Sequence, residues 1–182
     1  MLKRLAIPIL AGLVLGGIVH LVAVLIMPYF AEQDAYARLA TVGSINMVAQ
    51  IDDPDPFGAV LPDTDPAFVS AVCLYDLSTG PLKVRVPTTE DYTSISFYTR
   101  HGLPFYAIND RSAGRRVIEL DLMNPAQKAA LPENDEVTAA DRLVVESPEN
   151  EGIVLFRALA RERSTREAVR ARLGAATCGS GA

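Results

Sequence analysis

The chain has few of the residues from which catalytic and metal sites are usually built. Its 182 residues include only two cysteines and two histidines, and tryptophan is absent. No Gly-x-Ser-x-Gly sequence occurs. The missing Gly-x-Ser-x-Gly sequence argues against a serine nucleophile of the α/β-hydrolase type, and the cysteine spacing matches no metal or redox motif. Acidic residues outnumber basic ones by 22 to 17. Because nucleic-acid binding needs a concentrated positive field, we expect no nucleic-acid partner. We also expect no cofactor.

Acidic residues are also missing from the start of the chain, where an apolar segment stands alone. Residues 5–27 carry no charged side chain, and a helix of that length covers roughly 35 Å, enough to cross a bilayer. We expect an uncleaved anchor; the alternative is a secretory signal cleaved near Ala31. Lys3 and Arg4 precede the segment and Glu32 follows it. The positive-inside rule therefore predicts a cytoplasmic N-terminus at a bacterial inner membrane and a periplasmic remainder.

The remainder is more acidic than the whole chain, because setting aside Lys3 and Arg4 changes the net charge from −5 to −7. Residues 31–49 place apolar side chains at helical spacing and predict a helical connector. Residues 50–67 are rich in proline and aspartate and predict an irregular loop. The expected organisation is thus a cytoplasmic tail at 1–4, a transmembrane anchor at 5–27, the connector, the loop, and a periplasmic β domain with a C-terminal helix at 68–182.

About seven strands are predicted in the β domain, from apolar and polar alternation or short apolar runs. Their ranges are 68–77, 82–86, 94–98, 104–108, 116–122, 143–146 and 152–159. Ser78–Pro81 predicts a hairpin between the first two strands. Asn124 before Pro125 predicts a helix start, and Ser164–Glu167 predicts a capping box that opens a last helix ending at Gly174. We expect a mainly β fold, an antiparallel β-sandwich or open barrel with accessory helices, behind the N-terminal transmembrane helix.

The two cysteines, Cys73 and Cys178, have two interpretations. In an oxidising periplasm they could form a disulfide that closes a loop of about 106 residues, for which the chain-entropy estimate is roughly 4.7 kcal/mol. Cys73 also alternates with Val69 and Ala71 in a predicted strand, which suits a buried free thiol.

Four aspartates of the predicted loop form two D-x-D pairs: Asp53 with Asp55 and Asp63 with Asp65. Carboxylate oxygens at this spacing could hold a hard cation such as Ca²⁺. The further ligands of a calcium loop are absent at the required offsets, and a solvated acidic loop is the alternative.

His101 is the one histidine outside the apolar segment, so a general-base mechanism with imidazole would have to use it. Arg100 precedes it at the end of a predicted strand, and Asp110 and Arg111 follow some residues later. A hydrolase that used His101 with Asp110 and Arg100 or Arg111 would need these side chains within hydrogen-bond reach. A histidine in a surface turn is the alternative.

Five arginines lie on or just before the predicted last helix, at positions 161, 163, 166, 170 and 172. They make this segment positive within an acidic domain. The segment could face lipid headgroups or an acidic partner; the alternative is a solvated helix face.

Two motifs in the β domain match a known pattern. Asp76–Pro81 is a D-L-S-T-G-P turn between two predicted strands, and Val144–Pro148 is followed by Gly152–Arg157, a strand, Ser-Pro turn and strand ending in arginine. Both resemble the family called domain of unknown function 1254 (DUF 1254), and the resemblance covers about residues 40–173. It implies a β-rich domain that longer relatives continue, in the same chain, with a second β domain, the 1214 family (domain of unknown function 1214).

The resemblance suggests a short membrane-anchored form whose companion domain comes from another chain. We therefore expect an envelope protein of unknown activity, a binding or assembly module that works with a periplasmic partner of the 1214 family, with a lipid or glycan as a further candidate ligand. The alternative is a hydrolase of an envelope substrate that uses His101. A purely structural spacer is the third interpretation.

Overall fold

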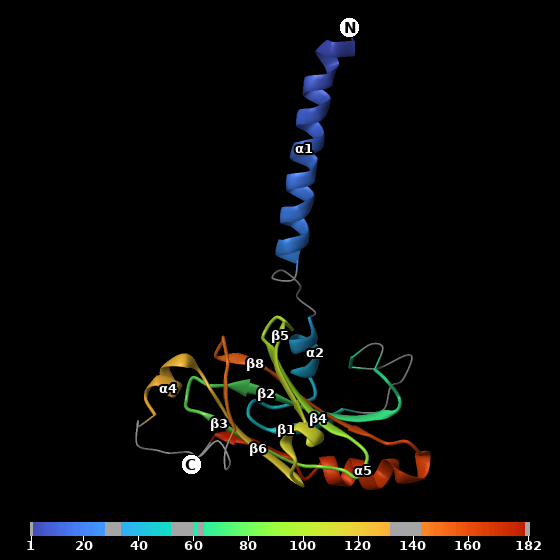
Figure 1. Ribbon diagram of the computed structural model, residues 1–182, viewed down its shortest axis with the longest axis vertical. Coiled ribbons are helices and arrows are strands. Elements are labelled where there is room, and N and C mark those ends of the chain that lie inside the picture. Colours follow the sequence, from blue (N-terminus) through green and yellow to red (C-terminus); the bar gives the residue numbers. More distant parts are fainter. Residues whose placement is uncertain (1, 28–33, 52–59, 62–63, 132–142, 181–182) are drawn as a thin grey trace. The chain divides into compact units, whose positions relative to one another are not determined.

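A computed structural model describes residues 2–27, 34–51, 60–61, 64–131 and 143–180 (Figure 1). The chain divides into two compact units, Met1–Asp34 and Ala35–Ala182. The first unit contains helix α1 (Leu2–Ile26). Its stretch Ala6–Ile26 is long and apolar enough to span a membrane. A helix of this kind near the N-terminus is either a single membrane anchor or a signal sequence.

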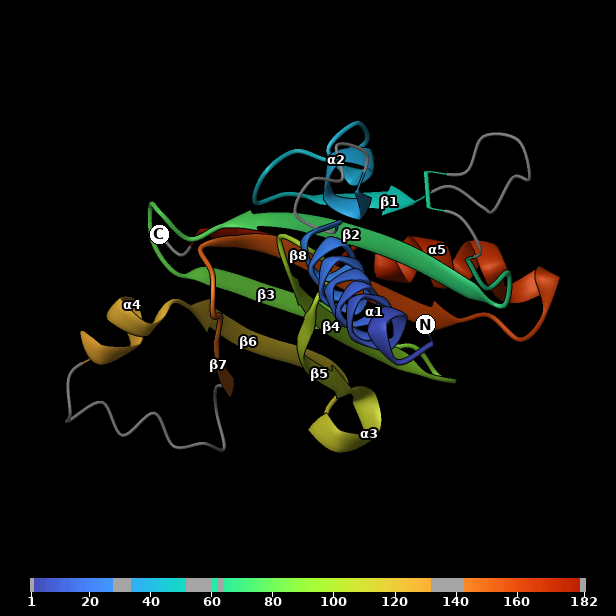
Figure 2. The same ribbon diagram turned by 90° about the horizontal axis from the view of Figure 1, so that it is seen from above.

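The second unit is built from two β-sheets (Figure 2). Sheet A is antiparallel, with strand order β1-β2-β8-β4-β5. Its strands are β1 (Val48–Ile51), β2 (Phe68–Asp76), β8 (Glu151–Leu159), β4 (Thr93–Thr99) and β5 (Pro104–Asn109). Sheet B has the order β7-β6-β3-β9 and is mixed, because β7 pairs with β6 in parallel. Its strands are β7 (Leu143–Glu146), β6 (Val117–Met123), β3 (Leu82–Pro87) and β9 (Thr177–Ser180).

The mainly β fold and all seven predicted strands are confirmed, but the region before them differs from the prediction. The predicted helix at 31–49 is wrong for most of its length: α2 covers only Ala35–Leu39, and Val48–Ile51 forms edge strand β1. Tyr36 and Leu39 are buried with Val72 of β2, so the hydrophobic spacing of the short helix serves contact with sheet A. The sandwich unit therefore begins at Ala35 rather than at residue 68.

The predicted hairpin at Ser78–Pro81 is also wrong. The turn joins β2 of sheet A to β3 of sheet B, and the two strands do not pair. Leu77 and Leu82, at either end of the turn, are both buried in the core, so the chain passes from one layer to the other. Interactions within the turn hold its shape. The Asp76 carboxylate accepts a hydrogen bond from the Ser78 N–H at 2.8 Å, and Gly80 has φ +152°, a conformation that favours glycine.

The main core lies between the two sheets. Alternate residues of β2, among them Ala71 and Cys73, meet residues of sheet B such as Val84 and Leu120 in one buried cluster. A disulfide between Cys73 of β2 and Cys178 of β9 crosses this core, with a Cα–Cα distance of 6.4 Å. Of the two interpretations of the cysteines, the structure therefore has the disulfide. It joins the last strand of the described chain to the opposite sheet.

Of the two helix starts predicted from capping residues, one is present in the structure and one is not. Helix α4 (Pro125–Ala129) has the predicted start: the Asn124 side chain accepts a hydrogen bond from the Gln127 N–H at 2.8 Å, and the Gln127 side-chain oxygen accepts one from the Asn124 N–H at 3.0 Å. The predicted capping box at Ser164–Glu167 is wrong, because the 3₁₀ turn η2 (Arg163–Thr165) occupies this position and no side chain caps α5 (Arg166–Leu173). Helix α5 ends at Gly174, as predicted.

Tyr75 is the largest side chain that is completely enclosed in the core. Its hydroxyl shares a hydrogen bond of 2.9 Å with the Ser147 hydroxyl. Burial raises the pKa of Tyr75 to about 12, and the negative charge of Glu149 acts in the same direction. The folded chain therefore holds this phenolic proton more tightly than the unfolded chain does.

We expect this proton to make the fold sensitive to high pH. Between about pH 10 and about pH 12 the unfolded chain loses the Tyr75 proton while the folded chain keeps it, so the free energy of unfolding falls as the pH rises. Urea unfolding of the full chain across this range measures the slope. Tyr75→Phe should remove part of it, whereas the control Tyr92→Phe should leave it intact; equal slopes in the wild type and Tyr75→Phe would contradict the assignment.

Candidate functional site

A cleft of about 620 Å³ lies between helix α5 and the turn that joins β3 to β4. Its volume is within the range of small-molecule sites. The lining residues come from three separate parts of the chain: the turn at residues 88–91, the region of residue 116 just before β6, and the segment from Leu159 through α5. The cleft is therefore a product of the tertiary fold rather than of a local motif.

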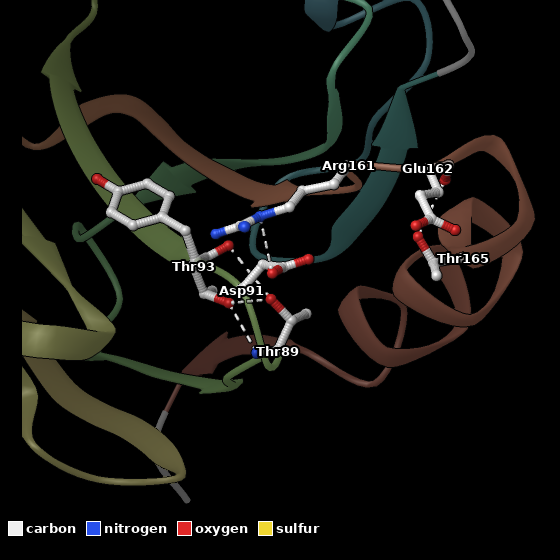
Figure 3. Close-up of polar contacts among 7 residues, drawn as sticks. Thr89, Asp91, Thr93, Arg161, Glu162 and Thr165 are labelled. Atoms are coloured by element: carbon white, nitrogen blue, oxygen red, sulfur yellow. Dashed lines mark hydrogen bonds and ion pairs between the residues drawn. The ribbon is translucent and has the colours of Figure 1, made fainter.

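The β3–β4 turn is fixed by hydroxyl groups (Figure 3). The Thr89 N–H donates to the Thr93 hydroxyl at 2.8 Å, and the two hydroxyls are 3.0 Å apart. The Thr89 hydroxyl is also placed to donate to the Tyr92 carbonyl at 3.2 Å. Because Thr93 is completely buried at the start of β4, this network attaches the turn to the rigid sheet.

Helix α5 forms the opposite wall. Leu173 at its end is buried in the main core, and Val169 packs against the same cluster. The Arg172 guanidinium donates from Nε to the Thr88 carbonyl at 3.2 Å, which ties the helix to the turn across the cleft. Leu159, Ala168 and Val169 make part of the lining apolar.

Charges of both signs surround the cleft. Arg116 and Arg172 line it, as do Glu90 and Asp91. Asp91 is held at its edge by an ion pair with Arg161, 2.9 Å from Nε to the carboxylate (Figure 3). The described lining residues include no histidine, cysteine, serine or lysine. Threonine and carboxylates are therefore the common nucleophiles among these lining residues.

The predicted hydrolase residues do not form one cluster. Arg100 and His101 lie in the turn between β4 and β5, whereas Asp110 and Arg111 lie in α3 (Asp110–Ala113) after the other end of β5. The six residues of β5 separate the two groups by about 20 Å, because a strand rises about 3.3 Å per residue. The Arg100 guanidinium lies 3.9 Å from the centre of the Tyr36 ring. Of the three residues predicted to act with His101, Asp110 and Arg111 are thus distant from it, and Arg100 is its chain neighbour.

Of the candidate metal ligands, Asp53, Asp55 and Asp63 lie outside the described residues. The Asp65 carboxylate accepts a hydrogen bond from the Ala67 N–H at 2.8 Å. In the part of the chain that the structure describes, no group of three or more His, Cys, Asp or Glu side chains could hold a metal ion.

Arginines near the C-terminal helix have structural partners in the sandwich. Arg166 donates to the carbonyls of Pro66 and Phe68 at 2.7 and 3.2 Å. Arg161 pairs with Asp91, and Arg172 bonds to Thr88. These side chains hold α5 and its approach against the sandwich, so the segment is not simply a positive face turned to solvent.

The family comparison covers most of the sandwich. The family described as "Protein of unknown function (DUF1254)" matches residues 45–177. The chain belongs to this family. The DUF1254 match runs from the residues just before β1 to the first residue of β9 and contains every described residue that lines the cleft. No curated protein matches the chain.

Two solved structures are similar to this chain. The VPA0106 protein from Vibrio parahaemolyticus is 14% identical, with a TM-score of 0.58 over 81% of this chain and 34% of its own. An uncharacterized protein from Burkholderia cenocepacia is 15% identical, with a TM-score of 0.44 over 63% of this chain and 31% of its own. The chain thus spans about a third of the length of these proteins, and the first of them shares its fold.

Proposed function

We propose that this protein is a membrane-anchored, non-catalytic module of the bacterial envelope that assembles with a companion β domain of the 1214 family. The observation that carries the proposal is the length of the VPA0106 protein, in which the same fold accounts for 34% of the chain. In that protein the sandwich therefore occurs with further chain beside it, and we infer that the sandwich described here also works beside a second domain. No observation favours the hydrolase, since β5 separates His101 from Asp110.

A candidate docking surface lies at one end of sheet A. We define this apolar end by Val42, Ile45, Met47 and Leu103, whose side chains are between 44% and 62% exposed. Apart from these four, Leu131 is the only large apolar side chain of the described sandwich unit that is counted as exposed. Clustered exposed apolar groups favour protein interaction.

The sheet register shows that these residues share one end. Ile45 forms a bridge with Leu74 of β2, Leu74 pairs with Ile153 of β8, and Ile153 pairs with Tyr98 of β4. The residue after Tyr98, Thr99, is hydrogen-bonded to Leu103 in the next turn. The loop before β1 and the β4–β5 turn therefore lie at the same end of the sheet, with β2, β8 and β4 between them.

Site-specific photo-crosslinking tests the assembly. The full chain, with a photo-reactive residue in place of Met47, is produced in bacterial membranes together with a 1214-family protein from the same genome. We expect a crosslink to that protein from position 47, and none from the exposed control position Ser112, which lies beyond the other end of β5. Equal crosslinking from both positions, or crosslinks from position 47 to lipid alone, would overturn the proposal.

The periplasmic location is a separate part of the proposal. It is supported by the Cys73–Cys178 disulfide, because such bonds persist in oxidising compartments. Alkylation of the full chain in freshly broken cells, followed by intact-mass measurement, tests it. We expect no alkyl adduct without reduction and two after reduction. Two adducts without reduction would place the domain in a reducing compartment.

A further inference from the structure

We propose that the cleft between α5 and the β3–β4 turn binds a small amphiphile with one anionic head, a carboxylate or a phosphate, and a short apolar tail. Docking of a companion domain at the apolar end does not require this site, so the inference goes beyond the proposed function. It rests on the hydrogen-bond capacity of two arginines, the balance of charge and the nature of the remaining lining.

The anionic head is recognised by Arg116 and Arg172. Arg172 uses Nε to bond the Thr88 carbonyl, which orients its guanidinium at the cleft. Arg116 is exposed, and within the described residues its side chain makes no hydrogen bond or ion pair. A guanidinium has five N–H donors in a planar fork, so both arginines keep donors for the paired oxygens of a carboxylate or phosphate.

The acidic side chains do not cancel this preference. Asp91 is already neutralised by Arg161 at 2.9 Å. Glu90 is exposed at the tip of the turn, where its carboxylate can extend into water. Two cationic groups of the cleft are thus opposed by one carboxylate without an ion pair in the described part of the chain. The balance favours an anion over a cation.

The rest of the lining favours an apolar tail over a sugar. Leu159, Ala168 and Val169 offer hydrocarbon. The two threonine hydroxyls of the turn have their protons engaged, because Thr88 donates to the Arg116 carbonyl at 2.9 Å and Thr89 is placed to donate to that of Tyr92. A glycan with several hydroxyls would therefore find few free hydroxyl donors on the turn, whereas an alkyl group would cover apolar surface.

Binding of monobutyl phosphate to the full chain in phosphatidylcholine nanodiscs tests the proposal. Calorimetric titration should detect monobutyl phosphate, and should show at least tenfold weaker binding for inorganic phosphate and for butanol, which each lack one half of the ligand. The absence of binding by monobutyl phosphate, or inorganic phosphate binding equally well, would overturn the proposal.

Two matched pairs of variants locate the binding. Arg116→Gln should raise the Kd about tenfold, because a charge-assisted bond is lost, while Arg115→Gln, at the neighbouring exposed arginine, should not change it. Ala168→Trp should block the cleft, while Ala171→Trp, on the same helix but outside the lining, should not. Unchanged affinity in Arg116→Gln and Ala168→Trp would place the ligand elsewhere and overturn the assignment.

A further arm identifies the source of the ligand. Nanodiscs that contain phosphatidic acid should weaken the apparent affinity for monobutyl phosphate if bilayer headgroups reach the cleft, which supports a lipid ligand. Unchanged affinity in these nanodiscs, with binding still lost in Ala168→Trp, supports a soluble anionic amphiphile.

Discussion

Gly152→Ala is expected to destabilise the sandwich by about 3 kcal/mol, because a methyl group at this position has no space. Gly152 lies in β8, the central strand of sheet A, opposite Tyr75 of β2 and Thr99 of β4. A β-carbon there would overlap the Tyr75 ring and the backbone carbonyl of Tyr98. The ring is buried and the carbonyl belongs to the sheet, so neither can move without breaking packing or strand pairing.

Chemical denaturation of the full chain measures this effect. The matched control is Gly179→Ala in β9, where a β-carbon would meet nothing within 4 Å. The control should change the free energy of unfolding by less than about 0.5 kcal/mol. A Gly152→Ala chain as stable as the control would show that the contact between β8 and Tyr75 is looser than the structure has it.

Removal of the disulfide is expected to have the largest effect on stability. Cys73 and Cys178 are 105 residues apart in sequence, and cross-linking a loop of about this length lowers the entropy of the unfolded chain by an equivalent of about 4.7 kcal/mol. The double variant Cys73→Ala/Cys178→Ala should therefore unfold roughly 10–20 °C below the wild type. Thermal unfolding followed by circular dichroism gives the shift.

The reduced wild-type protein is the control for lost side-chain volume, because it keeps both sulfur atoms in the core. If the cross-link carries the effect, the reduced protein should unfold close to the double variant and well below the oxidised protein. A double variant that unfolds at the wild-type temperature would contradict the chain-entropy account for this domain.

The strands that the sequence predicted share a clear local signal. Lys83 and Arg85 alternate with buried valines in β3, and both faces of β2 are largely buried, which explains its continuous apolar run. The missed strands lack such a signal. In β9, Thr177–Ser180 has no alternation and is placed by pairing with β3 and by the disulfide. β1 is an edge strand of only four residues, and the helical spacing that predicted a helix there belongs to the preceding short helix α2.

Long-range pairing could not be predicted from local patterns. The turn at residues 78–81 has the residues of a hairpin, but Leu77 and Leu82 both enter the core and direct the chain into the second sheet. The cleft was missed for the same reason. Its Arg116 comes from just before β6 and its Arg172 from α5, and the Thr88 carbonyl that Arg172 contacts lies 84 residues earlier in the chain. No spacing rule links such positions.

The strand order of sheet A has a consequence for how the protein is made. β8 pairs with β2 on one side and β4 on the other, so a ribosome must complete residues 151–159 before the two outer pairs of strands can be joined. β9, which closes one edge of sheet B, emerges later still. Before β8 is made, sheet A can form at most the separate pairs β1–β2 and β4–β5, and contacts across such long loops are slow to form. We therefore expect folding to follow synthesis rather than to accompany it, which leaves apolar strands in need of protection until the C-terminal part of the chain is available.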